Sequence, residues 1–249
     1  MSTGGFGRCN VVTRQWEGGY ADHPSDPGGK TMNGITEAVF HKWLRDKGLP
    51  LRQVRTITDT ETDKIYKENY WDPAGCERLF PGVDLTVYDA SVNSGVSRGK
   101  KWLQQSIGSD DHSVTVKRIC AKRSSFVHGL STFKVFGKGW VRRITAIEAT
   151  GVKWALESMK KPIPVVQETI RQEKEAAKKT ADAQASSAGT GVAPAGGAVV
   201  LPNTPIADSI SVIEKVLIIG VGTAALVGIV YLGYRAWVNY NRAAAYGRV

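Results

Sequence analysis

The apolar residues at the start of the chain recur at the three- and four-residue steps of a helix. These apolar residues are Phe6, Cys9, Val12 and Trp16. Their spacing predicts a first helix over about residues 7–17. The same period returns in three further stretches, residues 36–48, 58–73 and 83–107. These four stretches place the chain in the mainly α fold class.

Polar residues and helix breakers mark where these stretches begin and end. Thr36 is the predicted N-cap of the second stretch, and Thr58 opens the third with Glu61 three residues later. Pro73 is expected to end that helix. The pair Ser94-Gly95 interrupts the fourth stretch, so two helices are predicted there.

The composition changes twice after Pro162 and Pro164, which are expected to end the folded unit. Residues 165–183 are charged and predict a marginal helix. Residues 183–205 are rich in Ala, Gly, Ser and Pro and predict a flexible tether, because such a segment buries too little surface to offset its ordering entropy. Together they form a predicted linker over residues 161–210.

Residues 216–234 carry no charge and predict a transmembrane helix. Its interfacial belt would consist of Tyr231, Tyr234 and Trp237. The tail of residues 235–249 is basic, so the positive-inside rule places it in the cytoplasm and the N-terminal domain toward the periplasm or cell wall, anchored in an inner or virion membrane. Residues 1–6 lack the apolar segment of a signal peptide. Without a signal peptide, a C-terminal anchor that leaves the ribosome last would keep the N-terminal domain in the cytosol. The membrane topology therefore stays open.

The candidate chemistry begins at Glu17, in the run Trp16-Glu17-Gly18-Gly19-Tyr20. Gly18 and Gly19 are expected to end the first helix as C-caps with positive φ. The helix dipole and partial burial beside Trp16 and Tyr20 both disfavour an ionised carboxylate there. Glu17 is therefore the candidate general acid.

Two further residues extend the candidate catalytic site. Asp26 follows in the turn-forming run Asp26-Pro27-Gly28-Gly29, and Thr31 lies five positions beyond Asp26. A helix-end Glu that faces an Asp and a Thr from a tight hairpin suits cleavage of a glycosidic bond. Asp22 is the alternative to Asp26.

These stretches resemble glycoside hydrolase family 108, the N-acetylmuramidases found among phage endolysins and bacterial muramidase-like secretion factors. The matching words cover roughly residues 8–105: Glu17-Gly18-Gly19-Tyr20, Asp26-Pro27-Gly28-Gly29, Gly34-Ile35-Thr36, Ile65-Tyr66, Tyr70-Trp71 and Asp89-Ala90-Ser91-Val92-Asn93-Ser94-Gly95. The resemblance implies a catalytic Glu17 and a lysozyme-like helical domain with a small β-hairpin region. The order Glu17, Asp26, Thr31 is also similar to that of phage-type lysozymes.

The resemblance implies a division of the first 160 residues into a catalytic region, residues 1–97, and a basic helical region, residues 98–160. The second region is a possible peptidoglycan-binding part of the same unit. In members of the family, the corresponding loop contains Asp-Gly and Gly-Pro, and residues 108–115 lack both. The stretch from Phe136 to Arg143 resembles the family's closing helix, which is expected to pack back on the first half.

Four residues are candidates for substrate binding: Tyr20, Tyr70, Trp71 and Asn93. Tyr70 and Trp71 are either core residues or aromatic faces on which a sugar stacks. Asn93 either caps the turn at Ser94-Gly95 or contacts substrate. The sequence favours the structural role for these three residues and leaves the second role open.

The formal net charge of +10 is unevenly spread. Residues 1–97 hold 11 basic and 13 acidic side chains, whereas residues 98–160 hold 13 basic and 4 acidic. A basic flank suits an anionic polymer such as peptidoglycan. Because no nucleic-acid motif accompanies the charge, we expect no nucleic-acid partner. The three Cys and four His show no ligand spacing, so we expect buried free thiols, no metal and no cofactor.

The sequence thus predicts a membrane-tethered, lysozyme-type hydrolase of peptidoglycan glycan strands. One alternative is a lytic transglycosylase, in which the same Glu works without a second carboxylate. Another is a non-catalytic, wall-binding structural or virion protein. The sequence does not separate phage lysis or entry from cell-wall remodelling, inversion from retention of configuration, or one oligomeric state from another.

Overall fold

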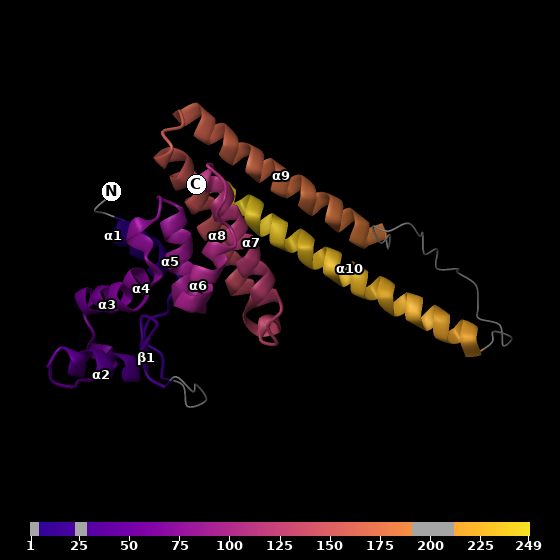
Figure 1. Ribbon diagram of the computed structural model, residues 1–249. Coiled ribbons are helices and arrows are strands. Elements are labelled where there is room, and N and C mark those ends of the chain that lie inside the picture. Colours follow the sequence, from indigo (N-terminus) through magenta and orange to yellow (C-terminus); the bar gives the residue numbers. More distant parts are fainter. Residues whose placement is uncertain (1–4, 23–28, 191–211) are drawn as a thin grey trace. The chain divides into compact units, whose positions relative to one another are not determined.

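The computed structural model describes residues 5–22, 29–190 and 212–249, with no side-chain description for residues 190 and 212–227 (Figure 1). The chain divides into two compact units, Met1–Val166 and Gln167–Val249. Regular structure in the described residues is almost entirely helical, with one small sheet. The predicted mainly α fold class is therefore confirmed.

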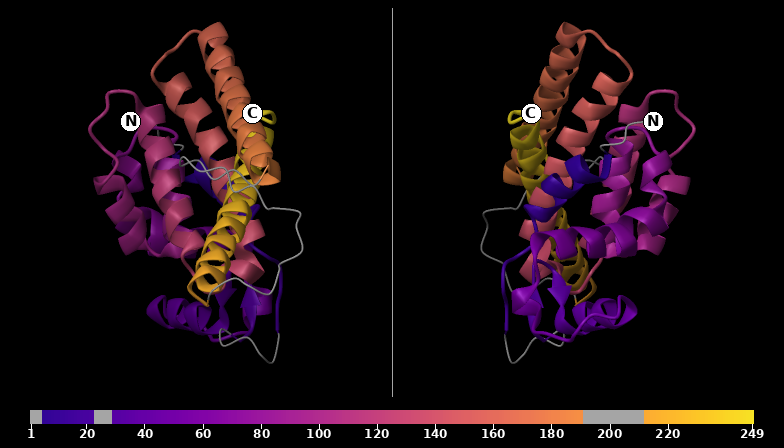
Figure 2. Two further views of the ribbon diagram at one scale, coloured as in Figure 1. Left: turned by 90° about the vertical axis from the view of Figure 1, so that its right-hand side faces the viewer. Right: turned by 90° about the vertical axis from the view of Figure 1, so that its left-hand side faces the viewer.

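The first unit contains the four predicted helical stretches and two further long helices. Its elements are α1 (Gly5–Arg14), β1 (Thr31–Met32), β2 (Ile35–Thr36), α2 (Glu37–Asp46), η1 (Val54–Thr56), α3 (Asp59–Tyr66), η2 (Lys67–Trp71), α4 (Asp72–Ala74), η3 (Cys76–Arg78), α5 (Val83–Ser94), α6 (Val96–Gln104), α7 (His112–His128) and α8 (Phe133–Ser158). In both views of Figure 2 the hairpin and α2 form one end of this unit, and the helices from α5 to α8 lie together away from it.

A small β-hairpin lies in the predicted region, and its turn is Asn33-Gly34. The turn that the sequence predicted, residues 26–29, falls mostly outside the described residues. Both residues have positive φ, 52° and 73°, as a two-residue hairpin turn of type I′ requires. Thr31 pairs with Thr36 and Met32 with Ile35 in the antiparallel ladder.

Two of the predicted helix starts are confirmed at atomic detail. The Thr36 hydroxyl oxygen accepts a hydrogen bond from the Val39 N–H at 3.3 Å. Thr58 and Glu61 form a reciprocal capping box at the start of α3. Each cap satisfies backbone donors that the first helical turn leaves without a partner.

The helical stretch predicted to end at Pro73 ends at Ala74, one residue later. The chain remains helical past α3, because η2 is a π-helical turn that shifts the hydrogen-bond register. Pro73 then falls in the first turn of α4, where a missing N–H costs nothing. Gly75, with φ of 73°, follows α4 as its C-cap.

Helix α5 is the centre of the first unit. Every residue from Val83 to Ser91 is buried, as expected for a helix packed on all sides. The predicted interruption at Ser94-Gly95 is confirmed, since α5 ends at Ser94 and α6 begins at Val96. Helices α1, α6, α7 and α8 all contact α5.

A close backbone approach fixes α8 against the start of α5. Gly82 has φ of 87°, and a Cβ there would lie 2.1 Å from the carbonyl oxygen of Gly151 in α8. A Cβ on Gly151 would in turn lie 2.9 Å from the Thr86 hydroxyl oxygen. The expected packing of the closing helix on the first half is therefore confirmed.

The second unit contains most of α9 (Ile163–Thr190) and all of α10 (Val212–Tyr246). Helix α9 continues to Thr190, whereas the sequence predicted a tether from residue 183. The reason is tertiary: side chains of α9 bond to α10, including Asp182 to Tyr240 at 2.7 Å and Gln184 to Asn239 at 2.9 Å. The rest of the predicted tether, residues 191–205, lies outside the described residues.

Among the residues that the structure describes, no helix is both long and apolar enough to cross a membrane. Residues 216–227 of the predicted span fall where side chains are not described.

Candidate active site

Glu17 lies just after α1 rather than in its last turn. The helix ends at Arg14, and the N–H groups of Trp16 and Glu17 bond to the carbonyl oxygens of Thr13 and Arg14 in two consecutive turns. Neither Gly18 nor Gly19 has positive φ, so the predicted glycine cap is wrong. The turns that follow Arg14 redirect the chain, and Glu17 is set by its own contacts.

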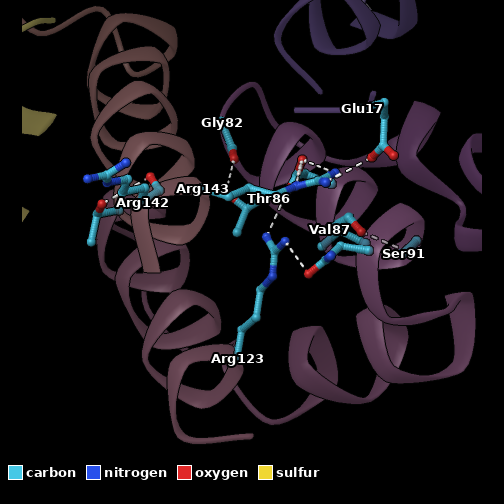
Figure 3. Close-up of polar contacts among 11 residues, drawn as sticks. Glu17, Gly82, Thr86, Val87, Ser91, Arg123, Arg142 and Arg143 are labelled. Atoms are coloured by element: carbon cyan, nitrogen blue, oxygen red, sulfur yellow. Dashed lines mark hydrogen bonds and ion pairs between the residues drawn. The ribbon is translucent and has the colours of Figure 1, made fainter. Parts of the chain in front are cut away.

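The Glu17 carboxylate is held by Arg143 of α8, 126 residues later in the chain (Figure 3). Arg143 Nη1 donates to Glu17 Oε1 at 2.8 Å, and the Glu17 side chain is 18% exposed. On its other side Arg143 faces Asp89 of α5, with Nε 3.0 Å from Oδ1 and Nη2 2.9 Å from the same oxygen. Arg143 thus joins the candidate acid to the centre of the fold.

A second arginine completes this buried network. Arg123 of α7 places Nη1 2.5 Å from Asp89 Oδ2, and neither side chain is exposed to solvent. Arg123 Nη2 also donates to Asn93 Oδ1 at 3.0 Å. Two carboxylates and two guanidinium groups therefore balance in formal charge, as buried charges require.

The pKa shifts in the network show which charges are paired. Burial alone would raise the pKa of Asp89, but the nearby Arg123 and Arg143 outweigh it and hold that pKa below its usual value. Burial would lower the pKa of Arg143, but the carboxylates of Asp89 and Glu17 raise it instead. Asp89 is therefore ionised, and Arg143 stays a cation.

The hairpin turn closes the other side of Glu17. A Cβ on Gly34 would lie 2.6 Å from Glu17 Oε2 and 2.7 Å from the Tyr66 hydroxyl oxygen. That hydroxyl donates to the carbonyl oxygen of Asn33 at 2.8 Å, which ties the turn to α3. Gly34 is thus required both for its φ and for the room that the carboxylate occupies.

Two tyrosines lie close enough to sense the charge of Glu17. Burial raises the pKa of Tyr66, and the negative charge of Glu17 raises it further. The pKa of Tyr70 is raised by the same two causes in the same order. Both phenols therefore stay neutral, and no described residue hydrogen-bonds the Tyr70 hydroxyl. Tyr70 is only partly buried and lies beside the candidate acid.

Two other predicted residues, Tyr20 and Thr31, lie near the surface on the hairpin side. Tyr20 is 40% exposed, its hydroxyl donates to Asp22 Oδ2 at 3.3 Å, and Arg55 lies 5.2 Å from its ring centroid. Thr31 pairs with Ala21 through two backbone hydrogen bonds, and its hydroxyl donates to the Gly29 carbonyl oxygen at 3.1 Å. Asp26 lies outside the described residues.

The two other candidate substrate-binding residues have structural contacts. Trp71 is 1% exposed, and its ring meets those of Phe6 and Tyr88 edge to face, so no ring face is left for a sugar. Trp71 belongs to the core, and the substrate-binding alternative is corrected for it. Asn93 is partly exposed, and its carbonyl oxygen is engaged by Arg123.

A pocket of about 450 Å³ lies beside α1 and reaches the turn that covers Glu17. Its lining residues are Gly7, Asn10, Val11, Arg14, Gln15, Asn33 and Asp63. Amide and carboxylate side chains of this kind can hydrogen-bond the hydroxyl groups of a sugar. In the described part of the chain, no three His, Cys, Asp or Glu side chains are grouped to hold a metal ion.

Sequence reasoning missed the residues that hold Glu17 in place. Gly34 was recognised only as part of a family word, although Asn-Gly between two short strands is itself a hairpin signal. Arg143 carries no local signal, because an arginine in a basic helix is usually solvated. Only the packing of α8 on α5 distinguishes Arg143 from Arg142.

Comparison with known proteins identifies the family of this chain. Residues 11–95 match the family described as Glycosyl hydrolase 108. The solved structure of SagA from Brucella abortus is 31% identical with a TM-score of 0.53, and the match covers 62% of this chain and 97% of the SagA chain. No curated protein matches. The chain therefore belongs to the glycosyl hydrolase 108 family and is a lysozyme-like glycoside hydrolase that acts on peptidoglycan.

Proposed function

We propose that this chain cleaves the glycan strand of peptidoglycan at the bond after N-acetylmuramic acid, with Glu17 as the general acid. The observation that carries the proposal is the position of the Glu17 carboxyl group. It lies between Arg143 and the Asn33-Gly34 turn and is still partly open to solvent. An acid that protonates a leaving oxygen must be held in place and must also be reached by the substrate.

The two oxygens of Glu17 have different surroundings. Oε1 accepts from Arg143, whereas Oε2 accepts no hydrogen bond from the described residues. Oε2 is therefore the oxygen on which the transferable proton would sit. After transfer, the ion pair with Arg143 stabilises the carboxylate that remains, and Asp89 keeps Arg143 in position.

The second catalytic group is proposed to be Asp26, with Thr31 helping to hold it or a water molecule. Thr31 supports this role because its backbone pairing with Ala21 brings the start of β1 close to the segment after Glu17. Asp22 is the alternative. The variants Asp26→Asn and Asp22→Asn distinguish the two candidates. Replacement of the catalytic carboxylate by an amide should lower the rate by orders of magnitude, whereas replacement of the other should not.

The decisive experiment replaces Glu17 by Gln and follows the turbidity of a cell-wall suspension. General acid catalysis contributes about 10²–10⁴-fold, so Glu17→Gln should lose at least that factor while folding normally. Glu157→Gln is the matched control, because Glu157 makes only an exposed 3.6 Å ion pair with Arg8. Wall lysis by the Glu17→Gln variant at the rate of the control would sink the proposal.

The chemistry of the products decides between hydrolysis and lytic transglycosylation. Hydrolysis leaves reducing muramic acid ends, whereas transglycosylation leaves anhydromuramic ends, and mass spectrometry distinguishes the two. The anomeric configuration of the first product reports the mechanism. Retention implies carboxyl groups about 5–5.5 Å apart, and inversion implies about 6.5–9.5 Å.

We further propose that residues 216–234 anchor the enzyme in a membrane, with the first unit facing the cell wall, in phage lysis or entry or in cell-wall remodelling. The uncharged stretch and the basic tail after it support the anchor. Flotation of the full chain with lipid vesicles tests membrane association. Protease accessibility of residues 1–160 in intact spheroplasts tests the orientation.

The contacts between α9 and α10 set a condition on that anchor. Glu173 of α9 pairs with Arg242 of α10 at 2.9 Å. A 19-residue helix covers about 28 Å, so a spanning segment would put residues before and after it on opposite faces of the bilayer. Insertion of residues 216–234 with α9 left on the wall side therefore requires this ion pair to break.

A further inference from the structure

A second pocket, of about 220 Å³, lies where the end of α5 meets α6, α7 and α8. Its lining residues are Asn93, Ser94, Arg98, Phe126, Val127, Leu130 and Trp140. None of them takes part in the proposed proton transfer. The pocket is thus a separate feature of the first unit.

One wall of this pocket is apolar and well supported. Phe126, Leu130 and Trp140 are partly buried and pack against a core cluster that contains Val127 and Ile144. Side chains backed by a core in this way are held in position before a ligand arrives. Such a wall suits methyl-bearing groups, such as alanyl or lactyl side groups.

The pocket is also lined by hydrogen-bond donors. The Arg98 guanidinium lies 4.5 Å from the Phe126 ring centroid and donates through Nη1 to the Ser94 carbonyl oxygen at 2.9 Å. No carboxylate of the described residues forms an ion pair with Arg98. Arg123 holds the Asn93 carbonyl oxygen, and the structure shows no acceptor for the Asn93 amide nitrogen among the described residues. These donors form a site for a carboxylate.

The pocket is joined to Glu17 by the buried network. Asn93 contacts Arg123, which contacts Asp89, which contacts Arg143. Asn93 and Asp89 are four residues apart on α5, about 6 Å along its axis. The network that holds Glu17 therefore also holds Asn93, a residue that lines this pocket.

We propose that this pocket binds the acidic peptide that peptidoglycan carries on its muramic acid residues, with a peptide carboxylate at Arg98. The inference rests on the proposed function, because it assumes that the glycan strand lies at Glu17. The excess of 13 basic over 4 acidic side chains in residues 98–160 favours an anionic ligand over a neutral sugar. The alanyl methyl groups of the peptide match the apolar wall.

The test compares two substrates: glycan strands with their peptides and the same strands after an amidase has removed the peptides. Arg98→Ala should lower kcat/KM for peptide-bearing strands about ten- to a hundredfold, the loss expected for hydrogen bonds to a charged group. It should leave the rate on peptide-free strands unchanged. Arg118→Ala is the matched control, because Arg118 is exposed, donates to the Ser106 carbonyl oxygen and lies outside the pocket.

Other results overturn the inference. An equal loss on both substrates would mean that Arg98 acts on the fold or on Glu17, and an equal loss in Arg118→Ala would reduce the effect to overall charge. Binding is measured separately by titrating the full chain with N-acetylmuramyl-L-alanyl-D-glutamate. If neither substrate is cleaved, the proposed function fails, yet loss of this binding only in Arg98→Ala would still support the pocket. Equal binding of an N-acetylglucosamine oligomer would assign the pocket to sugar instead.

Discussion

Replacement of Gly34 by Ala tests whether the hairpin turn sets the position of Glu17. The added Cβ would lie 2.6 Å from Glu17 Oε2, whereas ordinary contacts begin at 3.4 Å, so the carboxyl group or the turn must shift by about 0.8 Å. A misplacement of about 1 Å in a catalytic group costs on the order of 10²-fold in rate. We therefore expect Gly34→Ala to lose about 10²-fold in kcat/KM.

Gly48 provides a matched control for backbone strain. It has φ of 66°, close to the 73° of Gly34, but a Cβ there would meet nothing within 4 Å. Both substitutions place a Cβ on a residue in the left-handed conformation, which should lower the free energy of unfolding by about 1–2 kcal/mol and Tm by several degrees. Only Gly34→Ala also displaces the acid.

The assay is the initial rate of turbidity loss in a cell-wall suspension, measured well below the Tm of both variants. Circular dichroism melts then separate stability from activity. If Gly34→Ala and Gly48→Ala are equally active, the close contact between the turn and Glu17 does not govern catalysis. A large loss in Gly48→Ala would likewise refute the reasoning, because strain alone would then explain both.

Three further predictions concern the buried groups. Burial raises the pKa of Asp84 to about 6 from 3.8, despite the N–H groups that bond to it, so the folded state holds this proton more tightly than the unfolded chain does. This contribution to the free energy of unfolding should fall by about 3 kcal/mol as pH rises from about 4 to 6. Urea melts of the wild type and of Asp84→Asn over this pH range measure the change. Equal pH profiles of the two proteins would contradict the prediction. Arg143→Met should lower the free energy of unfolding by about 3–5 kcal/mol, measured by urea melts, because it leaves a buried charge short of a partner. Lys42→Met, at an exposed ion pair, should lower it by less than about 1 kcal/mol. Equal losses in the two variants would count against the buried network. The three free thiols, those of Cys9, Cys76 and Cys120, are buried. A thiol reagent at neutral pH should therefore label none of them in the folded protein and all three in guanidinium. Rapid labelling of the native state would refute their burial.

Local rules in the sequence predicted most of the helices of the first unit. Thr36 and Thr58 cap helices through side chains that bond backbone groups three residues away, so each signal is complete within a short window. The break at Ser94-Gly95 is equally local. The error at Gly18 arose where hydrogen bonds in two turns changed the local geometry after α1.

The sequence by itself determined the identity of Glu17 as the candidate acid, through the Glu-Gly-Gly-Tyr word and the family that it resembles. Only the tertiary structure decided what holds this carboxyl group. Arg143 reaches it from 126 residues away, and Gly34 reaches it from a hairpin turn. The physical reason is that helix caps and turns form between neighbours in the chain, whereas partners of a buried charge are chosen by how helices pack. No spacing along the chain encodes that choice.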